Sequence, residues 1–392
     1  MKITNVRVIS LSAVLPEDKR WRSDQGTILK FDGAMVKVET DDGISGHGPI
    51  YGAVPVVKAA VEQRLKQLLV GEDPTRIEYL WEKMYSGSRL SIALREGRSV
   101  PTPASGARGD NIVAISGIDV ALWDIAGRAL GVPIYKLLGG KVRDTIRGYA
   151  SGGWATGEAA GEEIKGYVAK GFNAIKMRIG GMDKSLGDSI NRVAAVRKAV
   201  SPDVEIMLDA HGSMGVAHAI KLAKAMEQFN VTWLEEPVSP DDKKGMAEVR
   251  AASSTPIAAG EREFTRYDFR DLIEARAVDW LQPDIAVCGG MSEIRRICAL
   301  ASAYNIPVAP HVWGSACIFA ASLQLAAATP NIPIFETSQA PLHPLLWDMT
   351  EPKFKVEKGY VTVPEGPGLG VDFDPEMEKR FPYADMPSLA PF

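Results

Sequence analysis

The chain has 392 residues, of which 46% are hydrophobic and 24% are charged, and its formal net charge is −4 at pH 7. This composition is typical of a globular enzyme that is long enough for two domains. The small negative charge and the lack of a Lys/Arg run argue against a nucleic-acid partner, and no apolar run is long enough to span a membrane. The three cysteines are scattered without CxxC spacing, which favours a cytoplasmic location over secretion.

The first 130 residues predict an α+β domain in which strands come before helices. Apolar and polar residues alternate over 3–13 and 34–40, as in half-buried strands, and the first segment predicts a strand rather than a signal peptide. The loop between them carries charged and aromatic side chains, namely Arg20, Trp21, Arg22 and Asp24. We expect a solvated surface segment here, or a binding element for an anionic substrate if the loop folds over a pocket. Residues 86–111, rich in Gly, Ser, Pro and Arg, predict a mobile loop that is either a lid or a linker.

A strand–helix rhythm fills the middle of the chain. Short apolar runs, each followed by a helix-like segment, end near residues 150, 179, 209, 235, 261, 282, 310 and 336. Eight such units predict a closed (β/α)8 barrel over residues 131–349, because the units share too little sequence for a solenoid. The tail, residues 350–392, alternates again over 358–375 and is expected to return to the first domain, residues 1–130, as an extra strand.

Three acidic residues recur once per strand–helix unit. Asp209, Glu235 and Glu261 each end an apolar run, and they are 26 residues apart in both intervals. One such acid is more often a helix N-cap, but three at equal spacing converge on the rim where barrel enzymes keep their chemistry. Three carboxylates would repel one another unless a cation lies among them, and all-oxygen ligation suits Mg²⁺. We therefore predict an Mg²⁺ site.

Two cations lie on one face of the second strand. Lys176 and Arg178 alternate with apolar residues in the segment NAIKMRIG, so that they point into the barrel. Unpaired charge is costly there, and we expect these side chains to pair with the metal carboxylates or with a substrate carboxylate. A purely structural ion pair with Asp209 is the alternative, and it is compatible with function.

Asp284 and His311 end neighbouring units, 27 residues apart. A carboxylate bound to one imidazole nitrogen fixes the tautomer and makes the other nitrogen more basic, which predicts His311 as a general base. His211 follows Asp209 by two residues and is either a general acid or a group that supports the site. Glu336 ends the eighth strand and faces the same cavity, where it is a candidate to bind an oxyanion. The other three histidines have no comparable context.

These segments together resemble the enolase superfamily, in its mandelate racemase-like subgroup, over nearly the whole chain. The segments that carry the resemblance are ISGIDVALWDIAGRALGVPIYKLLGG (115–140), LDAH, WLEEP, GE, QPD and PHVWG. The resemblance implies an α+β capping domain on a modified (β/α)8 barrel. It also implies Mg²⁺ on Asp209, Glu235 and Glu261, an Asp284–His311 dyad, and catalytic positions at Lys176, Arg178 and Glu336. In this family, capping-domain loops, here around 14–30 and 46–52, set specificity.

The implied chemistry is abstraction of the proton α to a carboxylate, which gives an enediolate. Where the racemase motif has a second lysine as base, this chain has Arg178, which cannot readily take up a proton because its pKa is above about 12. The Asp-x-His pattern at Asp209 and His211 is similar to that of sugar-acid dehydratases, in which such a histidine serves as acid. The segment GHGP at 46–49 departs from the more usual GWGE, so that specificity is not transferable.

The sequence therefore predicts a lyase that dehydrates a sugar acid, an aldonate or aldarate, to a 2-keto-3-deoxy acid, acting as a homo-oligomer on a small molecule. The nearest alternative is an isomerase, either an epimerase or a lactone cycloisomerase, on the same scaffold. Two further alternatives are a Schiff-base enzyme with Lys176 as nucleophile and a non-catalytic sugar-acid binding protein. The second of these has no need of an Asp284–His311 pair.

Overall fold

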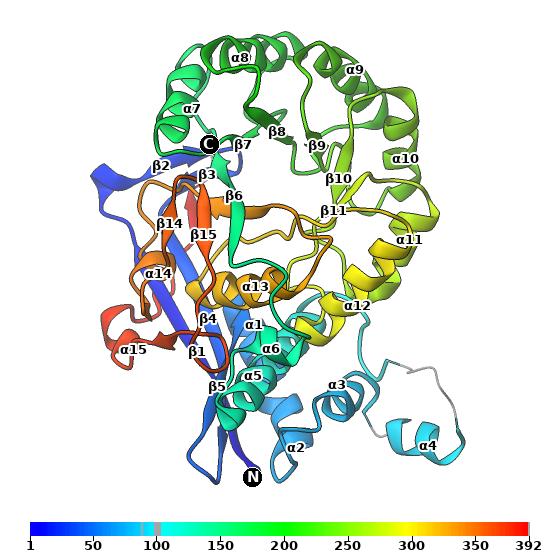
Figure 1. The fold of residues 1–392 in the computed structure, drawn as a ribbon, viewed down its shortest axis with the longest axis vertical. Coiled ribbons are helices and arrows are strands. Elements are labelled where there is room, and N and C mark those ends of the chain that lie inside the picture. Colours follow the sequence, from blue (N-terminus) through cyan, green and yellow to red (C-terminus); the bar gives the residue numbers. More distant parts are fainter. Residues whose placement is uncertain (88, 98–102, 391–392) are drawn as a thin grey trace.

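The computed structural model describes residues 1–87, 89–97 and 103–390, and it shows a capping part packed on a barrel of strands and helices (Figure 1). The expected α/β architecture, a modified (β/α)8 barrel with an α+β cap, is confirmed. No helix in these described ranges is long and apolar enough to cross a membrane.

The cap begins with an antiparallel sheet in the order β1-β4-β5. Its strands are β1 (Ile3–Val14), β4 (Lys30–Thr40) and β5 (Ser45–Ile50). The helices that follow are α1 (Val54–Ala59), α2 (Lys66–Leu69), α3 (Ile77–Ser86), α4 (Arg89–Arg95), α5 (Asp110–Leu130) and α6 (Ile134–Leu137), with a π-helical segment, η2 (Ala60–Leu65), between α1 and α2. Helix α4 occupies part of the 86–111 segment expected to be a loop, while residues 88 and 98–102 of that segment lie outside the described residues.

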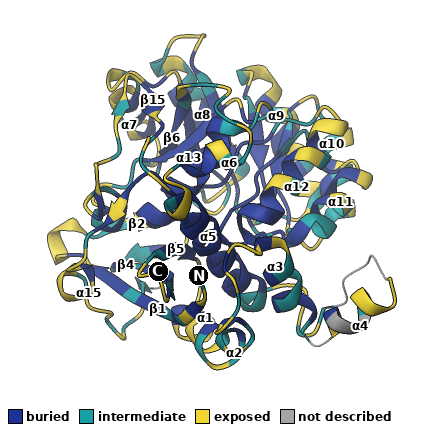
Figure 2. Ribbon diagram, turned by 60° about the horizontal axis from the view of Figure 1, so that its bottom comes forward, coloured by how far each residue is buried: buried dark blue, intermediate teal, exposed yellow. Residues whose placement is uncertain are grey.

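Helix α5 holds the cap together and is buried over most of its length, as its dark blue colour in Figure 2 shows. An apolar helix of this kind must be enclosed on all sides. Strand β5 approaches it so closely that a Cβ added at Gly48 would lie 1.8 Å from the carbonyl oxygen of Gly117. The glycines of the GHGP segment are therefore explained by packing against α5, and His47 between them donates its backbone N–H to Asp124 over 2.9 Å.

The barrel strands are parallel and run in the order β11-β10-β9-β8-β7-β6, with β12 paired to the other side of β6. They are β6 (Thr145–Gly152), β7 (Ala174–Arg178), β8 (Glu205–Asp209), β9 (Trp233–Glu235), β10 (Ile257–Ala259), β11 (Trp280–Leu281) and β12 (Phe335–Ser338). Segment 308–311 takes the remaining place through parallel bridges from Leu281 to Val308 and from Asp284 to His311. The surrounding helices are α7 (Ala159–Ala169), α8 (Leu186–Ala199), α9 (Val216–Met226), α10 (Lys243–Ala252), α11 (Thr265–Glu274), α12 (Gly290–Ala303) and α13 (Ala316–Ala328).

The inside of the barrel contains a separate apolar cluster that takes one side chain from each strand position. Its members are Tyr149, Ala174, Met207, Trp233, Ala258, Trp280, Ala309 and Ile334. Because side chains alternate along a strand, the residue two positions further on also points inward. At five of the eight positions that residue is charged or imidazole-bearing, namely Lys176, Asp209, Glu235, His311 and Glu336. The apolar layer thus closes the floor of a polar site.

The C-terminal tail touches both parts of the molecule. Its elements are α14 (Pro344–Trp347), β13 (Thr350–Glu351), β14 (Val356–Glu357), β15 (Tyr360–Thr362), β16 (Asp372–Phe373), α15 (Met377–Arg380) and β17 (Leu389–Ala390). Strand β15, in the 358–375 segment expected to join the cap, pairs instead with barrel strand β6. The same segment reaches the cap further on, where Leu369 donates its backbone N–H to Asp124 of α5 over 2.9 Å. The strand that the tail adds to the cap comes later still, where β17 pairs with β3 (Gly26–Ile28), the second strand of a hairpin that begins with β2 (Trp21–Ser23).

Candidate active site

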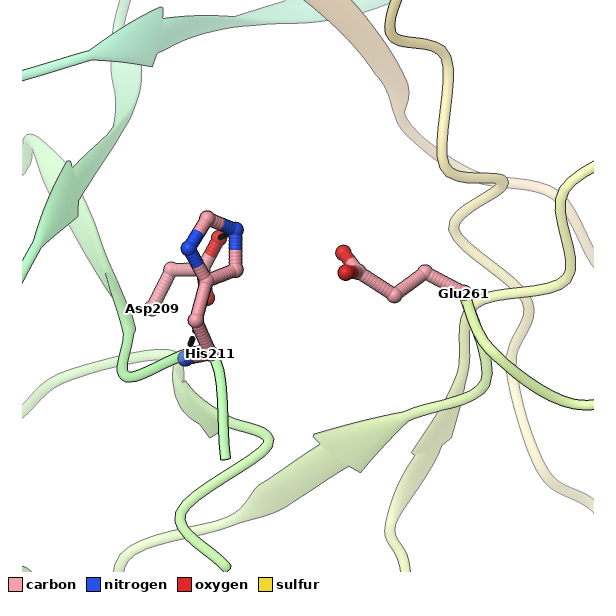
Figure 3. Close-up of side chains that lie close together, drawn as sticks. All are labelled: Asp209, His211 and Glu261. Carbon is pink, nitrogen blue, oxygen red and sulfur yellow. Dashed lines mark hydrogen bonds and ion pairs between the residues drawn. The ribbon is translucent and has the colours of Figure 1, made fainter. Parts of the chain in front are cut away.

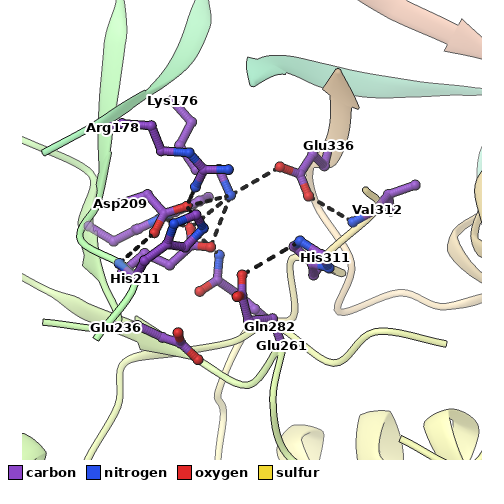
Figure 4. Close-up of polar contacts among 12 residues, drawn as sticks. Lys176, Arg178, Asp209, His211, Glu236, Glu261, Gln282, His311, Val312 and Glu336 are labelled. Carbon is purple, nitrogen blue, oxygen red and sulfur yellow. Dashed lines mark hydrogen bonds and ion pairs between the residues drawn. The ribbon is translucent and has the colours of Figure 1, made fainter. Parts of the chain in front are cut away.

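Strand register brings the expected site residues to one end of the barrel, and Figure 4 shows that those it labels, among them Lys176, Asp209 and His311, point toward one another. Arg178, Asp209 and Glu235 lie side by side as the last residues of β7, β8 and β9. Glu261 does not follow the period-two pattern, because it comes after Gly260, whose φ of +144° turns the chain at the end of β10. Figure 3 shows that the Glu261 side chain extends toward Asp209 and His211.

Lys176 lies at the centre of the carboxylates. Its Nζ is 2.9 Å from Glu235, 3.0 Å from Glu336 and 3.6 Å from Asp209, and the side chain is almost fully buried. Burial opposes the charge on Lys176, but Glu235 and Glu336 outweigh it and raise the pKa of the amine above its ordinary value. A lysine nucleophile needs a lowered pKa, so this surrounding argues against the Schiff-base alternative. Lys176 instead balances the buried carboxylates.

Glu235 is fully engaged by neighbours within the barrel. Besides Lys176, it accepts hydrogen bonds from Gln282 Nε2 over 2.7 Å and from Trp233 Nε1 over 3.1 Å. The carboxylates of Asp209 and Glu261 form a group with His211 instead, with one ligand atom from each lying within 4.8 Å of the others. The place of Glu235 in a metal site stays a prediction.

The donor set fits a divalent cation. Among the described residues, Asp209 Oδ2 and Glu261 Oε2 are buried oxygens that accept no hydrogen bond, although Arg178 lies against the first and the His311 imidazole against the second. Arg178 pairs with Asp209, and Arg262 lies 3.1 Å from Glu261. Burial opposes the charge of Glu261, but His311 in particular lowers the pKa of this carboxyl, which keeps it ionised. Ionised oxygens without hydrogen bonds are the ligands that hard cations take.

The predicted Asp284–His311 dyad is formed. Asp284 Oδ2 is 2.7 Å from His311 Nδ1, while Asp284 Oδ1 accepts the Ala286 backbone N–H over 2.7 Å. His311 Nε2 is left 3.5 Å from Glu261. Burial opposes protonation of His311, but Glu261 and the Asp284 hydrogen bond outweigh it and raise the pKa to about 9.

Glu336 is held on both oxygens. One lies 3.0 Å from Lys176, and the other accepts the backbone N–H of Val312 over 2.7 Å. Burial opposes its charge, but Lys176 and His311 lower the pKa of Glu336 to about 2. The contact of Glu336 with a substrate oxyanion stays a prediction.

The family of this chain can now be assigned. Residues 14–139 match the mandelate racemase / muconate lactonizing enzyme N-terminal domain, and residues 159–377 match the enolase C-terminal domain-like family. The chain belongs to the enolase superfamily. It is an enzyme of the mandelate racemase / muconate lactonizing enzyme group, and the matched ranges cover both the cap and the barrel.

Named relatives of this superfamily chain include both lyases and isomerases. It is 35% identical over 404 residues to a D-galactarolactone cycloisomerase of Agrobacterium fabrum, which covers 98% of this chain and 100% of the relative. It is 38% identical to a D-galactonate dehydratase of Ralstonia pickettii, over 87% of this chain and 88% of the relative. A solved enolase superfamily member from Polaromonas sp. JS666 is 34% identical, with a TM-score of 0.88 over 99% of both chains.

A small cavity of about 90 Å³ lies between the cap and the ends of the barrel strands. Its lining includes Arg178, His211, Glu261 and His311 from the barrel, together with a cap hairpin. The loop of residues 14–30 thus folds over the pocket, but Arg20 and Arg22, which suggested anion binding, do not line it. The hairpin residues that do are Trp21, Ser23, Asp24, Gln25 and Ile28.

An aromatic row forms another part of the pocket that the sequence did not indicate. Trp21 of the hairpin is 4.3 Å from Trp154 between ring centroids, and Trp154 is 6.0 Å from Trp313. The row continues to His343 at 6.2 Å and to Phe31 of the cap at 4.0 Å. Cap and barrel therefore share one aromatic wall, whose three tryptophans line the cavity.

Glu236 and Arg262 were also missed, although each directly follows a predicted metal ligand. Glu236 is buried with φ of +38°, and its partner is Arg262, which lines the cavity. Burial and the nearby Glu261 raise the pKa of Glu236 well above its ordinary value. The sequence did contain signals for this pair, because Glu236 is the second acid of the WLEEP segment and Arg262 is a cation directly after Glu261.

Proposed function

We propose that this enzyme dehydrates a sugar acid, an aldonate or aldarate, to a 2-keto-3-deoxy acid, with Mg²⁺ at Asp209, Glu235 and Glu261. Bound Mg²⁺ supplies positive charge for the substrate carboxylate, which makes the α-proton more acidic. Glu261 raises the pKa of His311, and with its charge shared with a bound cation His311 would be left as the neutral imidazole that a base requires.

The observation that carries the proposal is the pair of cavity-lining imidazoles, His211 and His311, each held by its own carboxylate. In Figure 4 they approach the carboxylate cluster from different sides. His311 Nε2 takes the α-proton, and the electrons of the C–H bond pass to the carboxylate as an enediolate. Burial and Arg178 lower the pKa of His211, and the hydrogen bond with Asp24 opposes this by favouring the protonated ring. The C–O bond at the β-carbon then breaks as the protonated His211 gives the departing oxygen its Nε2 proton. Water leaves, and the enol becomes the 2-keto acid.

Arg178 argues against racemisation by two bases. It is buried, paired with Asp209 and 3.9 Å from Asp24, and a guanidinium stays charged at neutral pH. No second base then faces the α-carbon from strand β7, since Lys176 is also held charged. Neither cation of β7 can therefore take or return a proton on the face of the α-carbon opposite His311, so we expect the intermediate to return to substrate through His311 or to lose its β-oxygen.

A lactone cycloisomerase is the second candidate, and it is favoured by the D-galactarolactone cycloisomerase relative, whose match covers 98% of this chain. Both reactions break the C–H bond at the α-carbon and the C–O bond at the β-carbon. If the departing oxygen is a hydroxyl, it is lost as water. If it is the ring oxygen of a lactone, the ring opens and the oxygen stays in the molecule. The product is then an isomer. The same two imidazoles serve either reaction.

The decisive experiment is a screen of purified protein with Mg²⁺ against acyclic sugar acids and their lactones in D₂O. We expect a 2-keto-3-deoxy product from an acyclic acid and no recovered C2 epimer. Deuterated C2 epimer without any keto acid would overturn the dehydratase proposal, and product from lactones alone would establish the cycloisomerase.

A further inference from the structure

We propose that Asp24, supplied by the cap, is a positioning residue that holds His211 for proton delivery to the departing oxygen. The inference rests on the proposed function, in which His211 is the acid. It assigns the enzyme a second Asp–His dyad, which forms only when the cap hairpin is docked on the barrel.

The contact itself is short and enclosed. Asp24 Oδ2 lies 2.5 Å from His211 Nδ1, with the two side chains 10% and 13% exposed. The other carboxylate oxygen of Asp24 lies 3.9 Å from Nε of Arg178. Asp24 therefore faces both the Arg178 guanidinium and the His211 imidazole. The other ring nitrogen of His211, Nε2, lies on the side of Asp209, 3.6 Å from its Oδ2. With Nδ1 occupied, Nε2 is the nitrogen that can serve a substrate.

Local structure places Asp24 at the tip of the hairpin. Strands β2 and β3 pair Ser23 with Gly26, which leaves Asp24 and Gln25 as a two-residue turn. The Ser23 hydroxyl accepts the Gln25 backbone N–H over 3.2 Å and donates to the Gly26 carbonyl over 3.0 Å. Gly26 has φ of +138°, and a Cβ there would lie 2.4 Å from the Ala390 carbonyl oxygen. These hydrogen bonds and the glycine hold the turn, and with it Asp24, in one conformation.

The hairpin is also fixed from outside. Trp21 packs on Trp154 of the barrel, and β17 at the end of the tail pairs with β3. These contacts orient the tip so that the Asp24 carboxylate enters the barrel mouth.

The two dyads differ in how they are assembled. Asp284 and His311 belong to neighbouring strand positions joined by a parallel bridge, so that this pair is present whenever the barrel is folded. Asp24 and His211 are 187 residues apart and come from cap and barrel. The His211 backbone is fixed separately by its N–H bond to Asp209 Oδ1 over 3.1 Å, so that Asp24 is needed only to hold the ring.

This difference predicts which step depends on Asp24. Abstraction of the α-proton uses His311 and needs no contact with Asp24. Departure of the β-oxygen uses His211, whose ring turns away more often without Asp24. Asp24→Ala should therefore slow formation of the keto acid by about 10- to 100-fold, the usual effect of removing a group that orients a catalytic residue. The enediolate then returns to substrate more often and gains solvent hydrogen at C2.

The test measures both steps in D₂O by NMR, with C2 exchange in recovered substrate and keto-acid formation followed together. We expect Asp24→Ala to lower product formation while exchange holds or rises. Asp24→Asn keeps an acceptor for His211 Nδ1 and should give an intermediate loss. Asp18→Asn, on the exposed η1 turn (Glu17–Lys19) of the same loop, is the matched control and should behave as wild type.

Three outcomes would overturn the proposal. These are an Asp24→Ala enzyme that equals wild type, one that loses exchange and elimination in the same proportion, and one that loses bound Mg²⁺. The second outcome would mean that Asp24 only anchors the hairpin. If the wild-type enzyme itself neither exchanges nor eliminates on any sugar acid, the proposed function fails instead, and the two failures are thereby distinguished.

Discussion

Asp284 and His311 face each other across a parallel bridge, with Oδ2 of the acid 2.7 Å from Nδ1 of the imidazole. The spacing of 27 residues is what one strand–helix–strand unit requires, so that the chain places both groups at adjacent strand ends. The bridge makes the dyad a property of the barrel alone. Its chemistry can be tested without disturbing the cap.

His311→Asn should abolish turnover, with a loss of at least about 100-fold, while substrate and metal binding stay measurable. Asp284→Asn should lower kcat by less, because the ring keeps its place but loses the carboxylate that fixes its tautomer. Steady-state kinetics and calorimetric binding check both variants. Turnover at the wild-type rate in both would exclude His311 as the base.

Removal of the central cation tests the balance of charge in the barrel. Lys176→Met leaves Glu235, Glu336 and Asp209 buried without their shared partner, and breaking a buried pair in this way costs about 3–5 kcal/mol. We expect a fall of that size in the free energy of unfolding, measured by urea denaturation in metal-free buffer. Lys165→Met, on the exposed face of α7, is the control and should change stability little. Equal stability of the two variants would contradict the central role of Lys176.

Metal titration decides the ligand set. Asp209→Asn and Glu261→Gln should each raise the Kd for Mg²⁺ at least about tenfold, and Glu235→Gln should do the same if Glu235 completes the site. His211→Asn should keep the affinity close to that of wild type, and the exposed Glu248→Gln serves as control. Calorimetry on the apoenzyme gives these values without reference to activity. Loss of affinity in His211→Asn with none in Glu235→Gln would assign the site to Asp209, His211 and Glu261.

The barrel and its inward-facing charges were predictable because strand periodicity acts locally. The alternation Lys176–Met177–Arg178 fixes which side chains point inward, and the repeat of Asp209 and Glu235 fixes their neighbours. The hairpin tip was not predictable in the same way. Nothing local in Arg20–Asp24 distinguishes a carboxylate that reaches His211 from a solvated loop, since the contact joins residues 187 positions apart. The pairing of β15 with β6 was also not predictable, because it depends on which strand edge is unpaired in the folded protein.

His343 shows the same limit from the opposite direction, because its sequence context gave no sign of burial. Its ring stacks on Phe31 with centroids 4.0 Å apart and meets Trp313 edge-on, and neither ring nitrogen has a hydrogen-bond partner among the described residues. Burial lowers the pKa of His343 to about 3. The stacked pair of Phe31 and His343 also joins the cap to the barrel, so that losing this contact would weaken the docking of the cap over the site.

Protonation of His343 should make the fold sensitive to mild acid. An unfolded histidine has a pKa of about 6.5, so that the unfolded chain binds the proton first. The stability that neutral His343 provides is complete above that pH and is lost as the pH falls from about 6.5 toward 3, by up to about 1.4 kcal/mol per unit. His343→Phe keeps a stacking ring without the titration, and should reduce the drop in Tm between pH 7 and pH 5. His218→Phe, at an exposed position on α9, should leave the wild-type drop in place. The same acid sensitivity in His343→Phe as in wild type would show that other groups cause it.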